Sequence, residues 1–273
     1  MKKEFDTPGS LKLVIRIPAG RTEIQTVDGN RTEIEVRPLA DDEASRTAAA
    51  ETSVEAREHG DRTVVHVEVP ESSRTFSFKH AQVLVVALVP HGSDIEANAA
   101  SADVEGRGRF GSGAIKTASG DVDLDKFDGT LEAKSASGDL SVGTVAGTAK
   151  VQTASGDIAI DDIGGAGKIQ SASGDVEVRQ ARSSLKVLTA SGDLSIGSVS
   201  EGEITLQSAS GDMQLGVRRG STLWIDAKSL SGETTSDLEV DDAPPEGPGP
   251  RLEVRANTMS GDIHVVRADA VPA

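Results

Sequence analysis

The sequence predicts an all-β protein, a β-solenoid of about 18-residue coils that follows an N-terminal β-rich cap with one helix. Three observations lead to this fold class. The tripeptide Ser-Gly-Asp recurs at a nearly constant spacing, apolar and polar residues alternate on both sides of each copy, and no helical pattern separates the copies. A unit this short cannot bury its own apolar face, whereas stacked units share a continuous core.

The chain opens with a segment in which apolar and polar residues alternate. Residues 11–17 are therefore predicted to form a half-buried strand, which we expect to end at Pro18-Ala19-Gly20. Asp28-Gly29-Asn30 is a typical turn sequence, and the apolar residues on either side of it predict a hairpin.

Residues 41–59 are rich in Ala and Glu. Two aspartates stand at the start of this segment and Gly60 follows it, so we predict a helix. Further strands are predicted at 64–69, 75–78 and 83–89. We expect residues 1–92 to be a capping region, because the first coil would otherwise expose a strand edge that invites aggregation.

The repeats fill the rest of the chain. Ser-Gly-Asp begins at Ser119, Ser137, Ser155, Ser173, Ser191, Ser210 and Ser260, and degenerate copies begin at Ser101 and Ser231. Successive spacings are 18 residues five times, then 19, 21 and 29. The longest spacing contains the Pro- and Gly-rich segment 241–250, which predicts a loop. We therefore expect a solenoid over residues 93–267 and a flexible tail over 268–273. A propeller is excluded, because its blades need roughly 40 residues each.

The glycines of the repeats are predicted to form structural turns, since glycine adopts a positive φ at a corner without steric cost. These turn glycines are Gly120, Gly138, Gly156, Gly174, Gly192, Gly211, Gly232 and Gly261. The alanine before most of the serines is expected to fit a corner with no room for a larger side chain. The Thr or Ser two residues before each serine is expected to join a hydroxyl ladder between coils.

The acidic residues of the repeats are the candidate functional residues, as a surface carboxylate ladder. They are Asp103, Asp121, Asp139, Asp157, Asp175, Asp193, Asp212, Glu233 and Asp262. Carboxylates stacked one coil apart repel by about 0.9 kcal/mol per neighbouring pair in water. Salt, hydrogen bonds from turn amides or a bound cation would offset this repulsion. We predict a turn-forming role for the column and keep cation binding as the alternative.

The segments 88–95 and 116–124, with the opening 5–11, resemble the putative-adhesin (Toastrack) family of bacterial β-strand repeat proteins with Ser-Gly-Asp repeats. The resemblance covers nearly the whole chain and implies a single-stranded right-handed β-helix. The resemblance implies no catalytic residues for this sequence. Some relatives stand beside membrane-stress response systems of the Lia and phage-shock types, where they look like assembly or sensing modules.

Composition excludes several classes of function. The net charge of −16 argues against nucleic acid as a partner, and the absence of cysteine excludes disulfides and thiolate metal sites. No apolar stretch is long enough for insertion into a membrane, and Glu4 follows Lys3 where a signal peptide would turn apolar. We therefore expect a cytoplasmic protein. No histidines stand at metal-ligand spacing, and no nucleophile motif occurs, so no catalytic, cofactor or metal site is assigned.

The predicted function is a non-enzymatic structural or interaction module, adhesin-like, which binds an unknown protein partner or copies of itself. The resemblance adds a link to envelope-stress signalling or assembly. Four alternatives remain: a cation-binding solenoid, a self-assembling scaffold of the bactofilin type, a β-helix carbohydrate-active enzyme and a left-handed acyltransferase solenoid. The last requires a six-residue period, which the apolar columns here do not follow.

Overall fold

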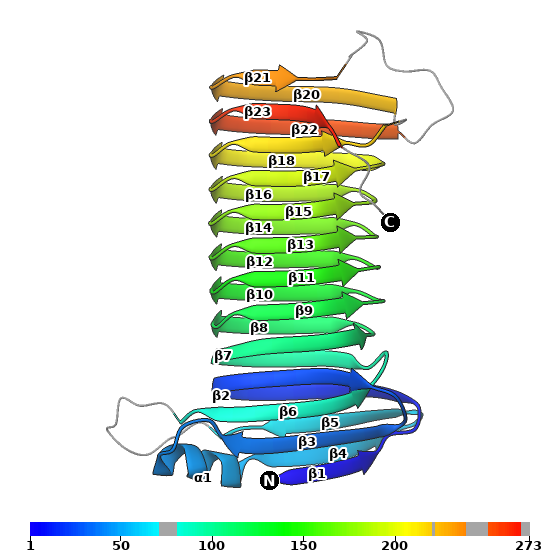
Figure 1. The fold of residues 1–273 in the computed structure, drawn as a ribbon, viewed down its shortest axis with the longest axis vertical. Coiled ribbons are helices and arrows are strands. Elements are labelled where there is room, and N and C mark those ends of the chain that lie inside the picture. Colours follow the sequence, from blue (N-terminus) through cyan, green and yellow to red (C-terminus); the bar gives the residue numbers. More distant parts are fainter. Residues whose placement is uncertain (71–80, 220–221, 239–250, 269–273) are drawn as a thin grey trace. The chain divides into compact units, whose positions relative to one another are not determined.

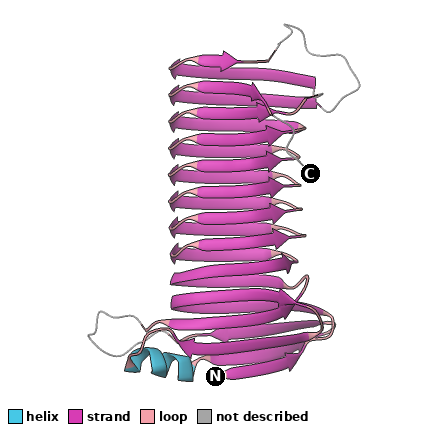
Figure 2. Ribbon diagram, viewed as in Figure 1, coloured by secondary structure: helices cyan, strands magenta, loops and turns pink. Residues whose placement is uncertain are grey.

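The computed structural model describes residues 1–70, 81–219, 222–238 and 251–268 (Figure 1). The chain divides into two compact units, Met1–Val142 and Gly143–Ala273. Strands make up most of the described residues of both units, with the helix α1 (Glu43–Glu51) in the first (Figure 2). The predicted all-β solenoid is confirmed. The strand expected at 75–78, the loop at 241–250 and residues 269–273 of the expected tail lie outside the described residues.

The first unit holds the strands β1 to β10. Their bounds are β1 Lys2–Asp6, β2 Ser10–Val27, β3 Arg31–Pro38, β4 Ser53–His59, β5 Arg62–Glu68, β6 Val83–Pro90, β7 Asp94–Phe110, β8 Gly113–Ser119, β9 Val122–Phe127 and β10 Leu131–Ser137. The strand β11 (Leu140–Val145) crosses the division between the units.

The long strand β2 organises the first unit. It pairs in parallel with β7 along one edge, and with β5 and then β6 along the other. The strand β3 is antiparallel to β6, β1 is antiparallel to β3, and β4 is antiparallel to β5. The predicted boundary at residue 92 therefore lies inside this unit, between two strands that are both partners of β2.

Two expectations for the start of the chain are wrong. The first strand does not end at Pro18-Ala19-Gly20, because β2 bends there and continues to Val27. Gly20 permits the bend with a φ of 123° and lies so close to β6 that a Cβ would be 2.0 Å from the Val83 carbonyl oxygen. The hairpin around Asp28-Gly29-Asn30 is also absent, because β6 lies between β2 and β3.

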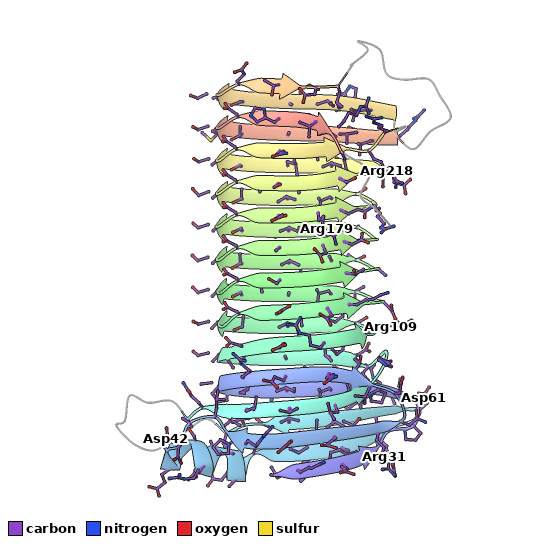
Figure 3. All side chains as sticks on the ribbon, viewed as in Figure 1. Arg31, Asp42, Asp61, Arg109, Arg179 and Arg218 are labelled. Carbon is purple, nitrogen blue, oxygen red and sulfur yellow. The ribbon has the colours of Figure 1, made fainter. Side chains whose placement is uncertain are left out.

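The helix predicted over 41–59 is shorter than expected. Asp42, labelled in Figure 3, caps it as anticipated, since its Oδ1 accepts the Ser45 backbone N–H at 2.7 Å. The helix ends at Glu51, and residues 53–59 form β4 instead. Val54 is 3% exposed there and pairs with Val67 of β5. Burial of this β-branched side chain in a sheet outweighs the helix propensity of its Ala- and Glu-rich neighbours.

The second unit holds the strands β12 to β23. Their bounds are β12 Ala149–Ser155, β13 Ile158–Ile163, β14 Gly167–Ser173, β15 Val176–Ala181, β16 Leu185–Ser191, β17 Leu194–Val199, β18 Gly202–Ser210, β19 Met213–Val217, β20 Thr222–Ser231, β21 Thr234–Ser236, β22 Arg251–Ser260 and β23 Ile263–Arg267. Each coil consists of one strand before the Ser-Gly-Asp turn and one strand after it. Most neighbouring coils pair in parallel with a register of 18 residues, as in Val151 with Ile169 and Ile158 with Val176.

The last coils of the second unit are not stacked in sequence order. The strand β22 pairs with β18 on one side and with β20 on the other, and β23 pairs with both β19 and β21. The coil β22–β23 therefore lies between the coil that ends at Val217 and the coil β20–β21, although it is the last in the chain (Figure 1). The order of the last coils in space therefore differs from their order in the sequence.

The predicted apolar columns form the interior of each unit. Val151, Ile169 and Val187 are fully buried in the second unit. In the first, the rings of Phe110 and Phe127 stack with centroids 5.4 Å apart, and both side chains are 0% exposed.

Two other columns differ from expectation. The alanines before the turns point outward and are exposed, and Met259 and Leu230 occupy the same position in the last two coils, so the position has ample room. The Thr and Ser hydroxyls form no ladder between coils in the described bonds. Thr153 Oγ1, for example, donates to the Ser155 carbonyl oxygen of its own turn at 3.0 Å.

Candidate functional site at the Ser-Gly-Asp turns

The turn glycines are required for two reasons. Gly156 and Gly174 have φ values of 125° and 115°, in the left-handed region that the sequence prediction assigned to them. A Cβ on Gly174 would also be 2.2 Å from the carbonyl oxygen of Gly156 in the preceding coil. Of the eight predicted turn glycines, Gly120 and Gly232 lie outside the positive-φ region. Close approach of the next backbone still excludes a side chain at both positions.

The carboxylates of the turns are linked to the backbone of the neighbouring coil. Asp175 donates its N–H to Oδ1 of Asp157 at 2.8 Å, and Oδ1 of Asp175 accepts the N–H of Asp193 at 2.8 Å. The same bond recurs in the first unit, where the Asp139 N–H donates to Asp121 at 3.0 Å. Each such carboxylate therefore fixes the turn that follows it, which is the turn-forming role proposed from the sequence.

The chain of bonds follows the stacking order rather than the sequence. Asp262 donates its N–H to Oδ1 of Asp212 at 2.8 Å, and Glu233 donates its N–H to Oδ1 of Asp262 at 2.8 Å. The described residues include no group of three or more His, Asp or Glu side chains placed to hold a metal ion. Within each unit, the row is therefore a series of hydrogen bonds from the turn of one coil to the carboxylate of its neighbour.

Replacing one carboxylate separates hydrogen bonding from charge repulsion. We expect Asp175→Ala to lower the free energy of unfolding by about 0.5–1.5 kcal/mol, because the Asp193 N–H loses its acceptor. Asp175→Asn retains an acceptor oxygen and removes the charge, so it should cost less. Urea unfolding of both variants at low and high salt measures this. An alanine variant at least as stable as the wild type at low salt would show that repulsion dominates.

A second charged group lies on β7 and β9. Arg107 donates to Asp123, to Glu105 at 2.8 Å and to Asp125 at 3.1 Å. These hydrogen bonds, that to Asp123 first, raise the pKa of the guanidinium. Arg109, labelled in Figure 3, donates to Asp128. Arg107 thus links β7 to Asp123 and Asp125 of the neighbouring strand β9, and its contact with Glu105 lies within β7.

An ion pair also joins β2 to β7 in the first unit. Lys12 Nζ lies 2.6 Å from Glu96 Oε2, and this bond holds the pKa of the Glu96 carboxyl below its usual range. Both side chains are about one-third exposed, so the pair contributes little to stability.

The outer face of the strands before the turns carries a column that the sequence analysis missed. Lys150, Lys168 and Lys186 lie one coil apart on β12, β14 and β16, in direct register. Lys168 and Lys186 are exposed, and neither is within ion-pair distance of a described carboxylate. Their constant position, five residues before each serine, was the signal that would have revealed the column.

The other candidates for chemistry do not converge. A hollow of about 280 Å³ in the first unit includes His66, Glu55 and Glu68, and one of about 460 Å³ is lined by residues around Asp28 and Arg31. His264 Nδ1 is 2.6 Å from Thr235 Oγ1, with no carboxylate in the contact.

No helix of the described residues is long and apolar enough to cross a membrane.

Comparison with known proteins follows the repeats closely. The family model described as Toastrack DUF4097 matches residues 9–166 and 143–266, nearly the whole chain. The chain belongs to the Toastrack family. No curated protein matches this Toastrack chain.

Solved structures resemble the Toastrack chain at low identity. A putative cell adhesion protein from Clostridium sporogenes is 10% identical with a TM-score of 0.28, covering 98% of this chain and 99% of its own. A putative adhesin from Bacteroides fragilis is 10% identical with a TM-score of 0.35, covering 97% of this chain and 96% of its own. The family assignment rests on the family model alone.

Proposed function

We propose that this Toastrack chain is a non-enzymatic, adhesin-like scaffold that binds a protein partner with an acidic surface. The observation that carries the proposal is the column of Lys150, Lys168 and Lys186. These side chains stand at the spacing of parallel strands, about 4.8 Å, on a flat sheet of a protein whose net charge is −16. Lys168 and Lys186 repel each other at this distance, and an acidic partner would relieve that repulsion.

Capture of partners from the native host tests the lysine column. We expect the double variant Lys168→Glu/Lys186→Glu to lose a partner that the wild type retains, while Ser195→Glu/Gln214→Glu retains it. The control adds the same number of carboxylates to exposed positions of β17 and β19, after the turns. Added salt should weaken the retained complex, because the attraction is screened. Equal binding by both variants would exclude the lysine face.

The same proposal predicts no catalytic turnover. The chain should not hydrolyse sugar esters or polysaccharides, or transfer acyl groups from acyl-CoA, because the contact between Thr235 Oγ1 and His264 Nδ1 includes no carboxylate that would orient the imidazole as a base. A reproducible turnover that one substitution in the solenoid abolishes would overturn it. The identity of the captured partner decides whether the scaffold serves membrane-stress signalling, the role that the family resemblance implies for some relatives.

A further inference from the structure

Among the described residues, no strand covers the apolar interior of the second unit at β20. One edge of β20 pairs with β22, and no strand of the described residues pairs with its other edge. The inward-facing Leu223 and Ile225 are only partly buried. Their partners in register, Leu252 and Val254 on β22, are 1% and 0% exposed. The apolar core that fills each coil therefore meets no covering strand at β20.

The outward side of β20 has a symmetric pattern. Trp224 is 42% exposed and Leu230 is 83% exposed, and they stand at the two ends of the strand. Between them lie Asp226 and Lys228, whose Oδ1 and Nζ are 2.9 Å apart. The order along the strand is thus apolar, acidic, basic, apolar. A strand with this order is complementary to itself when it is read in the opposite direction.

We propose that β20 pairs antiparallel with β20 of a second copy of the chain, with Ala227 on the two-fold axis. In this register Asp226 lies opposite Lys228 of the second copy, and Trp224 lies opposite Leu230 of the second copy. The two-fold symmetry makes each of these pairs occur two times. Cross-strand pairs of opposite charge and of apolar side chains stabilise antiparallel sheets. On the inward side of the same register, the partly buried Ile225 lies opposite Ser229 of the second copy and Leu223 lies opposite Ser231, so the outward pairs carry the complementarity.

The charges select this register over its neighbours. A shift of the second strand by two residues in one direction places the Asp226 side chains of the two copies opposite each other. A shift by two residues in the other direction places the Lys228 side chains of the two copies opposite each other. Both shifts bring like charges together, which is destabilising, and a shift by one residue faces outward side chains with inward ones. The register about Ala227 alone pairs both charges and both apolar ends.

The free edges of the first unit are of a different kind. The strand β1 carries Lys2 and Lys3, and β4 carries Glu55 and Arg57. Charged side chains on an edge strand, lysine above all, discourage pairing with another chain. The edge of β20 is therefore more favourable for pairing with a second copy than the edges of β1 and β4, and a two-fold contact of this kind closes at a dimer and gives no filament.

A single cysteine tests the register directly, because the chain has none of its own. In Ala227→Cys the two sulfhydryl groups of a dimer would face each other across the axis, where antiparallel Cα atoms are about 4.5–5.5 Å apart. We expect a disulfide-linked dimer under mild oxidation. Ala209→Cys, on the exposed face of β18, is the control and should stay monomeric on a non-reducing gel. Equal cross-linking of both variants, or none for Ala227→Cys, would overturn the proposal.

Charge exchange gives a second, independent test on the full chain. We expect sedimentation of the wild type to give a dimer of the 28.2 kDa chain, and Asp226→Lys and Lys228→Asp each to weaken it roughly tenfold or more. The double variant Asp226→Lys/Lys228→Asp restores the opposite pairs and should restore the dimer. A wild type that stays monomeric at micromolar concentration, or a double variant as weak as the single ones, would refute the pairing.

The apolar ends have a matched control in the neighbouring coil. Leu230→Ser should weaken the dimer, because Leu230 is the expected contact of Trp224 in the second copy. Met259→Ser removes a comparably exposed side chain, 62% exposed, from the same column on β22, which is not the edge strand. It should leave the dimer unchanged. Equal weakening by the two variants would place the contact on the sheet face and contradict edge pairing.

Discussion

Gly174→Ala is expected to lower the free energy of unfolding by roughly 2–6 kcal/mol. Two costs combine at this position. An alanine would be held at a φ of 115°, and its Cβ would be 2.2 Å from the carbonyl oxygen of Gly156 and 2.7 Å from the carbon. Because both atoms are backbone of the neighbouring coil, relief requires the coils to separate. Urea unfolding followed by circular dichroism measures the loss.

Gly29→Ala is the matched control for this substitution. Gly29 has a φ of 105°, yet no heavy atom lies within 4 Å of the position that its Cβ would take. The control therefore carries the conformational cost alone, about 1–2 kcal/mol. The difference between the two variants measures the close approach of the coils. Equal losses of stability in the two variants would mean that neighbouring coils can move apart to accommodate a Cβ. The glycines of the turns would then be required only for their positive φ.

Phe127→Ala is expected to lower the free energy of unfolding by about 3–5 kcal/mol. Phe127 is fully buried against Phe110, and its ring also fills the space that Gly113 leaves, where a Cβ would be 2.5 Å from Cε1. Phe110 and Phe127 thus fill a large part of the core of the first unit. Phe127→Leu retains most of the volume and should cost far less. A loss below about 1 kcal/mol for the alanine variant would contradict this packing.

The sequence predicted the repeating part well because each coil is specified locally. The alternation around Ile158 and Ile160, and the glycine at each corner, are decided by residues within one unit of 18. The family resemblance and the apolar columns pointed to the same solenoid. Within each unit, the carboxylates of neighbouring turns follow one another at the constant spacing of the repeat, and their hydrogen bonds to the next turn agree with the predicted turn-forming role.

The parts that were not predicted depend on contacts between distant segments. The alternation of residues 11–17 is compatible with a strand of any length, and only the approach of β6 to Gly20 shows that β2 continues to Val27. Likewise, Ser53–His59 contains enough Ala and Glu to resemble a helix until β5 is placed beside it. Local patterns carry no information about which strand arrives as the neighbour.

The position of β22 has a consequence for the order in which the protein can be completed. During synthesis, residues 222–236 emerge before residues 251–267, yet in the finished fold β20 joins β18 only through β22. The coil β20–β21 therefore has no native strand partner within its own unit until the later coil has been made. Residues 251–267 therefore connect the coil β20–β21 to the preceding coil. A chain that ends before them would have a last coil that pairs with no other strand of its unit. In such a chain Ile204 and Leu206 of β18, which are 0% exposed beside β22 in the finished fold, would also lack the strand that covers them.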